Sequence, residues 1–250
     1  MSRPAADPRP FLLLSTRAED AAAHAEQLSF ARAMRIAPAA LHQIRLERGT
    51  PGRLDLAGYS GIVVGGGPYN YSDAAKPPRQ REVEAWFADL LAEVLGTGYP
   101  FFGACYGVGL LGVAGAGVVS RAHGEEAGVV AARLTEAGRA DPVLAGLPGV
   151  FHAAVGHKEA IEVLPESATL LAVGEACPVQ MFRLGPNAYA TQFHPELDAD
   201  AFAQRLAIYN RHGYFSPGGD ARAVAESRRL RVERSGAMLA NFARLHARPR

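Results

Sequence analysis

The sequence predicts an α/β protein with a mostly parallel central sheet covered by helices. Short apolar runs at residues 11–14 and 61–64 have the composition of strands that are buried on both faces. These runs alternate with longer segments that carry apolar residues at helical spacing, as at residues 80–95. A chain of 250 residues with 48% hydrophobic content can bury one large core. Strands that alternate with helices imply a parallel sheet, whose functional residues lie at the carboxyl ends of the strands.

The first half of the chain contains this alternation in order. Residues 1–9 are rich in Pro and Ala and are expected to be loose. The predicted strands lie at 11–14, 41–46, 61–64 and 99–104, and the predicted helices lie at 21–34 and 80–95. One face of the second helix should pack on the sheet, because its apolar residues recur every three or four positions. These residues are Val83, Trp86, Phe87, Leu90, Leu91 and Val94.

The second half is richer in short β runs and turns. Runs at 128–134, 168–173 and 179–184 predict antiparallel strands that flank the parallel core. A helix is predicted over 199–211, a break at 215–219, and a last Arg-rich helix from 221 to 245. We therefore expect one domain over 10–212 and a C-terminal helical extension over 213–250 that packs on it.

Reactive chemistry is indicated by the segment Gly103-Ala104-Cys105-Tyr106-Gly107, which follows an apolar strand. A strand that turns sharply into a helix strains its central residue, and glycines flank that residue where a Cβ would collide. The helix N-terminus would then stabilise negative charge on the Cys105 sulfur. An isolated pattern of this kind is equally typical of a small buried cysteine in a tight turn. Partner residues must therefore decide between the two interpretations.

A base and its partner are predicted at the end of a later strand, where residues 191–196 read Thr-Gln-Phe-His-Pro-Glu. A cysteine nucleophile needs an imidazole that takes its proton and later passes it to the leaving group, and His194 fits this role. The other ring nitrogen needs an acceptor, and extended chain puts residues two apart on one side. Glu196 is therefore predicted to orient His194. Pro195 between them suits the end of a strand.

A third motif ends another predicted strand, at Gly65-Gly66-Gly67-Pro68. A loop of this kind exposes backbone N–H groups, and each donor fixed toward a developing oxyanion is worth about 3–4 kcal/mol. We pair the N–H of Gly67 with that of Tyr106. The run lacks the spacing of phosphate-binding glycine loops, and alone it is equally consistent with a flexible turn.

In this order along the chain, the three motifs resemble those of the class I glutamine amidotransferases, which use a Cys-His-Glu triad to release ammonia from glutamine. The likeness spans roughly residues 10 to 200, and it is closest to stand-alone proteins that resemble the glutaminase domain of GMP synthase. The resemblance implies a flavodoxin-like three-layer fold. It also implies a thioester on Cys105, acid/base catalysis by His194, orientation by Glu196, and oxyanion donors at Gly67 and Tyr106.

The resemblance further implies a pocket for a small amide, either glutamine or a γ-glutamyl compound. Gly66, Pro68 and Tyr69 would line it beside the oxyanion loop. His157, in the stretch Gly-His-Lys-Glu, would lie near the substrate, although such a stretch is also typical of a solvated turn. Glu126 resembles the glutamate that follows the elbow helix in the family and would support the pocket.

One position departs from the family pattern. Family glutaminases usually carry Gln where this chain has Gly109, which has no side chain to hydrogen bond with the substrate. We therefore expect weaker selection of glutamine, because specificity depends on paired polar groups. Three possibilities stay open: ammonia release toward a separate synthetase subunit, hydrolysis of γ-glutamyl peptides without an acceptor, and a non-catalytic family member.

The composition narrows the remaining classes of function. The net charge of +1, with arginines spread along the chain, does not indicate nucleic-acid binding. Two distant cysteines and the absence of a long apolar stretch argue against a disulfide framework, secretion and a membrane span, and favour the cytoplasm. Metal-ligand spacings, a Walker motif and an ATP pyrophosphatase signature are all absent. We therefore expect no metal, no cofactor and no ammonia acceptor within this chain.

Overall fold

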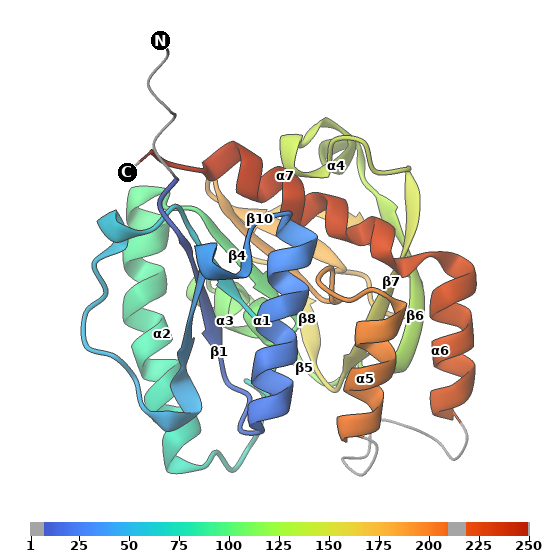
Figure 1. Cartoon of the computed structure of the whole chain (residues 1–250), viewed down its shortest axis with the longest axis horizontal. Coiled ribbons are helices and arrows are strands. Elements are labelled where there is room, and N and C mark those ends of the chain that lie inside the picture. Colours follow the sequence, from blue (N-terminus) through green and yellow to red (C-terminus); the bar gives the residue numbers. More distant parts are fainter. Residues whose placement is uncertain (1–7, 210–218, 250) are drawn as a thin grey trace.

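The computed structural model of the chain describes residues 8–209 and 219–249, and in this part a nine-stranded sheet forms the centre of the molecule (Figure 1). Its strands are β1 (Phe11–Ser15), β2 (Leu41–Arg45), β3 (Ile62–Val64), β4 (Phe101–Ala104), β6 (Glu125–Leu134), β7 (Val150–His157), β9 (Thr169–Val173), β10 (Met181–Leu184) and β11 (Ala188–Thr191). The strand order is β2-β1-β3-β4-β11-β10-β9-β6-β7. Strands β2, β1, β3, β4 and β11 pair in parallel, and the others pair antiparallel. The predicted mostly parallel α/β sheet with antiparallel additions is confirmed.

The inner parallel strands β3 and β4 are apolar and fully buried because helices cover both faces of the sheet, whereas the edge strand β2 also carries polar residues. Helices α1 (Asp20–Met34) and α7 (Ala237–His246) cover one face, and α2 (Pro78–Thr97) and α3 (Tyr106–Ala114) cover the other (Figure 1). Alternate residues of β1 enter different cores: Leu13 packs with α1 and α7, and Leu12 packs with α2. The helices predicted at 21–34 and 80–95 are confirmed, with ends that differ by one to two residues.

The antiparallel half of the sheet carries the remaining helices. These are α4 (Glu136–Ala140), α5 (Ala199–Tyr209) and α6 (Gly219–Leu230). Helices α5 and α6 lie beside β6 and β7 and share a small apolar cluster that includes Ala154, Phe202 and Leu206. A separate antiparallel pair joins β5 (Val118–Ser120) to β8 (Ala160–Val163). Short 3₁₀ helices lie at Pro38–Ala40, Leu46–Arg48, Leu56–Gly58, Pro142–Leu144 and Val232–Gly236.

The single C-terminal helix predicted over 221–245 is wrong. The chain leaves α6 at Arg231, which has a positive φ of 55°, and passes through the 3₁₀ helix Val232–Gly236 before α7 begins. Val232 and Ser235 are fully buried in this connection. The break is needed because α6 packs beside β6, whereas α7 lies against α1 on one face of the sheet. One straight helix cannot reach both places.

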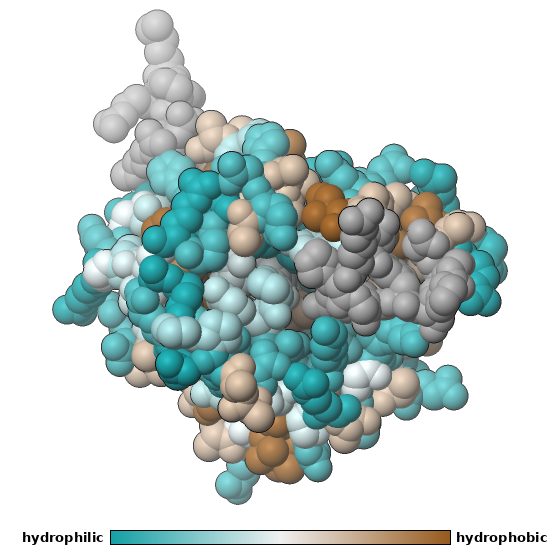
Figure 2. Space-filling model, turned by 90° about the horizontal axis from the view of Figure 1, so that it is seen from below, coloured by the Kyte–Doolittle hydropathy of each residue, from teal (hydrophilic) through white to brown (hydrophobic). Residues whose placement is uncertain are grey.

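Several predicted features concern the ends of the described segments. Residues 1–7 of the predicted loose N-terminus and residues 215–218 of the predicted break lie outside the described residues. Arg9 is held in place, since its backbone N–H donates to the carbonyl of Arg248 at 2.8 Å. None of the helices in the described part has the length and apolar character that a bilayer crossing requires. Figure 2 views the molecule from the end at which β1 finishes, where hydrophilic side chains dominate and hydrophobic ones form separate patches.

Candidate active site

Cys105 lies at the sharp turn between β4 and α3. Its backbone has φ 54° and ψ −93°, a strained conformation for a residue with a side chain. A hydrogen bond of 2.8 Å from its N–H to the carbonyl of Thr191 ties the turn to β11. A Cβ on Gly103 would lie 2.8 Å from the Cα of Gly107, so glycine is required at Gly103. The predicted elbow is therefore present, and its strain is held by the strand pair β4 and β11.

His194 follows β11 and faces the elbow. Its backbone N–H donates to the carbonyl of Ala154 at 2.8 Å, which fixes the chain on β7. Its Nδ1 lies 2.8 Å from Oε1 of Glu196, in the i, i+2 arrangement that the sequence predicts. A Cβ added to Gly66 would lie 2.6 Å from Cε1 of His194 and 3.4 Å from Cβ of Cys105, so both side chains reach one point. The structure thus brings the sulfur, the imidazole and the carboxylate together.

We call Cys105, His194 and Glu196 the relay. Contacts within the relay shift the pKa values of His194 and Glu196 in opposite directions. Burial alone lowers the pKa of His194, but the Glu196 carboxylate and the neighbouring Cys105 outweigh burial and raise it from 6.5 to about 9. Burial alone raises the pKa of Glu196, but His194 and the more distant Arg205 lower it from 4.5 to about 2. Glu196 is therefore an anion and His194 carries a proton near neutral pH. The hydrogen bond between them fixes the orientation of the imidazole ring.

The same pair makes stability depend on pH. Because the pKa of His194 is raised in the folded state, His194 contributes to the free energy of unfolding. This contribution is complete below pH 6.5 and is lost as the pH rises through about 9. The Glu196 contribution is present above pH 4.5 and is lost as the pH falls through about 2. We expect Glu196→Gln to lose less stability than the native protein as the pH rises from 6.5 to about 9, since the Glu196 charge is the largest of the effects that raise the pKa of His194. Urea unfolding at both ends of this range measures the difference, and equal losses in the two proteins would contradict it.

Two backbone N–H groups border the sulfur. Gly67 and Tyr106 both line a small hollow with Cys105. Tyr106 is the first residue of α3, where N–H groups have no partner within the helix. Among the described residues, neither the Gly67 N–H nor the Tyr106 N–H takes part in a backbone hydrogen bond. Gly67 has no room for a side chain, because its Cβ would overlap Oγ1 of Thr16. Backbone acceptors therefore do not occupy these two N–H groups, and their role as oxyanion donors stays a prediction.

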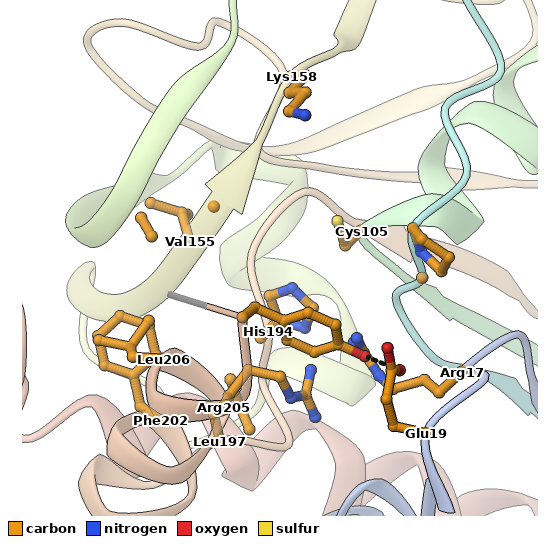
Figure 3. Close-up of a pocket in the computed structure, with 15 residues that line it drawn as sticks. Arg17, Glu19, Cys105, Val155, Lys158, His194, Leu197, Phe202, Arg205 and Leu206 are labelled. Atoms are coloured by element: carbon orange, nitrogen blue, oxygen red, sulfur yellow. Dashed lines mark hydrogen bonds between the residues drawn. The ribbon is translucent and has the colours of Figure 1, made fainter. Parts of the chain in front are cut away.

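Two hollows meet at Cys105. We call the first the main cavity; Figure 3 shows that Cys105 and His194 face it, together with Arg17 and Arg205. It is also lined by Gly67, Pro68, Ala127, Val155, Gly156, Lys158, Leu197, Phe202, Leu206, Tyr209 and, at the rim, Glu19. We call the second, smaller hollow the side pocket. It is lined by Gly67, Tyr69, Asn70, Cys105, Tyr106, Gly156, His157, Lys158, Glu159 and Gln192.

The residues predicted to line the substrate pocket are divided between the two hollows, and Glu126 lines neither of them. Pro68 lines the main cavity, and Tyr69 and His157 line the side pocket. Gly66 lies against Cys105 and His194. Glu126 is exposed on β6, far less enclosed than its neighbour Glu125.

Glu125 faces inward where the sequence suggested Glu126. Its Oε2 lies 2.8 Å from Nε2 of His157 and accepts a hydrogen bond of 2.8 Å from Nε2 of Gln180. The other ring nitrogen of His157 lies 2.9 Å from the carbonyl of Glu159. Both ring nitrogens of His157 are therefore engaged within the protein, so this residue shapes the side pocket by its position. Successive residues of a strand point to opposite faces, which separates the roles of the two glutamates.

The residues around Gly109 show why this position has no side chain. A Cβ there would lie 3.1 Å from Cβ of Tyr71 and 3.2 Å from Oε1 of Glu159, which leaves no room for a glutamine side chain without movement. Glu159 is itself held, because its carboxylate accepts backbone hydrogen bonds of 2.7 Å from Tyr71 and from Ser72. A buried acid and a tyrosine thus occupy the space beside Gly109. The role of Glu159 was not predicted, because this residue stands in a stretch that is typical of an exposed turn.

Two arginines at the cavity were also not predicted from the motifs. Arg17 follows β1, and Arg205 lies on α5 between Phe202 and Tyr209. A signal was present for Arg205, because spacings of three and four place it on the apolar face of its helix. Arg17 stands at the carboxyl end of a parallel strand, where functional residues gather.

One buried group combines residues that often bind metals. A carboxylate oxygen of Glu125, a ring nitrogen of His157 and the sulfur of Cys177 all lie within 4.8 Å of one another. Burial, followed by the charge of Glu125, raises the pKa of Cys177 to about 12, so its thiol stays protonated. Cys177 is fully buried, as expected for a packing residue, and its thiol donates to the carbonyl of Val179 at 3.5 Å. We therefore assign this group no reactive role.

Comparison with known proteins agrees with this geometry. The sequence model of the family described as glutamine amidotransferase class-I matches residues 31–208. The chain is 30% identical over 139 residues to the glutamine-hydrolyzing GMP synthase of Bacillus mycoides, a match that covers 55% of this chain and 24% of that protein. It is 29% identical over 149 residues to one subunit of the glutamine-hydrolyzing GMP synthase of Methanoregula boonei, a match that covers 59% of this chain and 71% of that protein.

A solved structure extends the likeness to nearly the whole chain. The glutamine amidotransferase of Thermotoga maritima superposes with a TM-score of 0.76 at 20% sequence identity, over 95% of this chain and 98% of that one. At this level of identity the likeness establishes the fold. That fold is the three-layer α/β arrangement, in which Cys105 lies between β4 and α3 and His194 follows β11.

Proposed function

The chain belongs to the class I glutamine amidotransferase family, and from this premise we propose that it hydrolyses a γ-glutamyl amide through a thioester on Cys105. The observation that carries the proposal is the relay at the elbow. Cys105 and His194 reach one point beside Gly66, and Nδ1 of His194 lies 2.8 Å from Glu196. A thiol, a base and an orienting acid in this order are what nucleophilic amide cleavage requires.

The chemistry has two stages. In the reactive state the proton of the thiol resides on His194, in keeping with the raised pKa of that imidazole. The Cys105 sulfur attacks the amide carbon, and negative charge develops on the carbonyl oxygen beside the N–H groups of Gly67 and Tyr106. The C–N bond then breaks, His194 donates its proton to the leaving nitrogen, and a thioester remains. In the second stage His194 takes a proton from water, the resulting hydroxide attacks the thioester, and the C–S bond breaks. The sulfur regains its proton from His194, and a carboxylic acid is released.

Two forms of this reaction are possible, and they differ in the leaving group. With glutamine, ammonia leaves, and a separate synthetase subunit would consume it; the similarity to a protein named as a subunit of GMP synthase supports this form. With a γ-glutamyl peptide, an amine leaves and no acceptor is needed. The filled space beside Gly109 supports the second form, because no side chain at that position can hold free glutamine.

Covalent labelling tests the proposal. Incubation with a chloroketone analogue of glutamine should add one label to the protein, and peptide mass spectrometry should place it on Cys105. Cys177→Ala is a matched control, because it removes the other of the two cysteines in the chain and should leave labelling unchanged. A protein that takes up no label, or takes it up only on Cys177, would contradict the proposal and would favour a non-catalytic family member.

A further inference from the structure

We propose that the main cavity binds the amine half of the substrate, and that this half carries a carboxylate held by Arg17 and Arg205. The inference rests on the proposed amide hydrolysis and names its substrate class: a γ-glutamyl amide of an amino acid or short peptide. Four observations lead to it. They are the place of His194, the state of the two arginines, the balance of charges around the cavity and the apolar part of its wall.

The position of His194 assigns the two hollows. A general acid must reach the nitrogen of the leaving group, so the leaving group lies on the side of the sulfur that His194 occupies. His194 lines the main cavity. Of the two proposed oxyanion donors, Gly67 lines both hollows, and Tyr106 lines the side pocket with Cys105. The acyl half therefore belongs in the side pocket, and the amine half belongs in the main cavity.

Arg205 carries a charge that the described residues do not fully satisfy. Its side chain is only 11% exposed, and its Nη1 lies 3.6 Å from Oε1 of Glu196, too far for a hydrogen bond. Within the described residues, this buried Nη1 has no hydrogen-bond partner. Burial and the charge of Arg17 both lower the pKa of Arg205. A buried, unpaired N–H of a cation is costly, and an anionic ligand would remove that cost.

Arg17 provides a second guanidinium on the same side of the cavity, held rigidly. Its Nε donates to Oε1 of Glu26 at 2.8 Å, and the side chains of both residues are buried. Its guanidinium carbon lies 5.3 Å from the centre of the Tyr209 ring. Figure 3 shows Arg17 and Arg205 near His194, with Lys158 on the opposite wall. Each guanidinium presents a planar fork of N–H donors, the geometry that binds a carboxylate.

The charges around the cavity favour an anion. Arg17 and Glu26 form one ion pair. Glu196 is hydrogen-bonded to His194, whose pKa is raised to about 9. Arg205 lies 3.6 Å from Glu196 but shares that carboxylate with His194, so these groups together have one positive charge in excess. At the rim, Lys158 and Glu19 are both exposed and of opposite sign, so they do not change the balance.

Four large apolar side chains form much of the remaining wall of the main cavity. Val155, Leu197, Phe202 and Leu206 line the main cavity, and Leu197 and Phe202 are each 2% exposed. Ammonia is too small to cover this surface, and it carries no negative charge that could pair with Arg205. An amino acid with an apolar side chain would use both the wall and the arginines. The cavity therefore fits a leaving group that is larger than ammonia and carries a carboxylate.

Arg205 has a competing role that the test must separate. In that role it only stabilises the Glu196 carboxylate, whose pKa it helps to lower. Its loss would then lower kcat for every amide alike, because the relay would be damaged. If Arg205 binds substrate, its loss would raise KM only for substrates with a carboxylate on the amine half.

The experiment compares γ-glutamyl-phenylalanine with its C-terminal carboxamide, which differ only in that charge. We expect the native protein to prefer the acid by about 10-fold to 100-fold in kcat/KM, the range for a hydrogen bond to a charged group. In Arg205→Gln the preference should fall to near one, through a higher KM for the acid. Arg228→Gln is the control: Arg228 is 61% exposed and pairs with Asp200 outside the cavity, so the preference should persist. If Arg205→Gln does not fold, Arg205→Lys should retain a reduced preference.

Three results would overturn the inference. Equal use of acid and carboxamide by the native protein excludes recognition of the carboxylate. An equal fall of kcat for both substrates in Arg205→Gln assigns Arg205 to the relay. Hydrolysis of glutamine alone, with neither dipeptide cleaved, excludes the larger leaving group. In all three cases Cys105 would still be labelled by the chloroketone, whereas failure of the proposed hydrolysis itself would abolish that labelling.

Discussion

Cys105→Ala is expected to abolish amide hydrolysis, lowering kcat by about 10⁴-fold to 10⁶-fold, as removal of a catalytic nucleophile does. Without the sulfur no thioester forms, and only the oxyanion donors and the bound substrate remain. The fold should persist, because the strained turn is held by backbone hydrogen bonds that alanine retains, including the one to Thr191. Release of the amine from the better of the two substrate types, glutamine or a γ-glutamyl dipeptide, measures the effect.

Cys177→Ala is the matched control for this substitution. Cys177 is fully buried and far from the elbow motif in sequence, and its thiol is kept protonated because burial raises its pKa. Its loss should change stability slightly and leave kcat within a small factor of the native value. Full activity in Cys105→Ala would exclude covalent catalysis, and equal loss in both variants would show that the assay reports folding and not chemistry.

Gly103→Ala should have the largest effect on stability among substitutions at the elbow. The new Cβ would lie 2.8 Å from the Cα of Gly107, and this contact is with backbone that cannot rotate away. Strand β4 or helix α3 must therefore shift, at a cost of about 1–3 kcal/mol or more for an overpacked site. The shift also displaces Cys105, so activity should fall with stability. Urea unfolding and amide hydrolysis measure the two effects.

Gly107→Ala tests the same elbow with a different expected result. Its Cβ would meet Val64 at 3.8 Å, an ordinary contact. Alanine also favours the helix that Gly107 occupies by roughly 1 kcal/mol over glycine. We therefore expect a stable, active protein, although both glycines belong to the same motif. Equal destabilisation by the two substitutions would contradict this account of the turn.

The parallel core was predictable because its signals are local. Residues 11–14 and 61–64 are uniformly apolar, which only a strand buried on both faces requires. The i, i+2 spacing of His194 and Glu196 likewise predicted their hydrogen bond. The C-terminal helix was mispredicted for the converse reason. Helical spacing continues across Arg231, and only the burial of Val232 beneath the turn shows that the chain changes direction there.

The surroundings of the elbow depended on contacts between distant parts of the chain. Glu159 reaches the backbone of Tyr71, 88 residues away, and together they fill the space beside Gly109. Arg17 and Arg205 come from opposite ends of the chain to line one cavity. No spacing rule links such residues, because their proximity is a product of strand order and helix packing.

The amino-acid sequence by itself determined the layered α/β architecture and the order of three motifs, since burial patterns and turn chemistry act over a few neighbouring residues. Only the tertiary structure decided which hollow each motif faces, which glutamate of β6 points inward, and which side chains supply charge around the sulfur. These properties depend on the register of β6 with β7 and on the packing of α5 against β7. Distances and burial in three dimensions set them, and those quantities are not written in any single stretch of the chain.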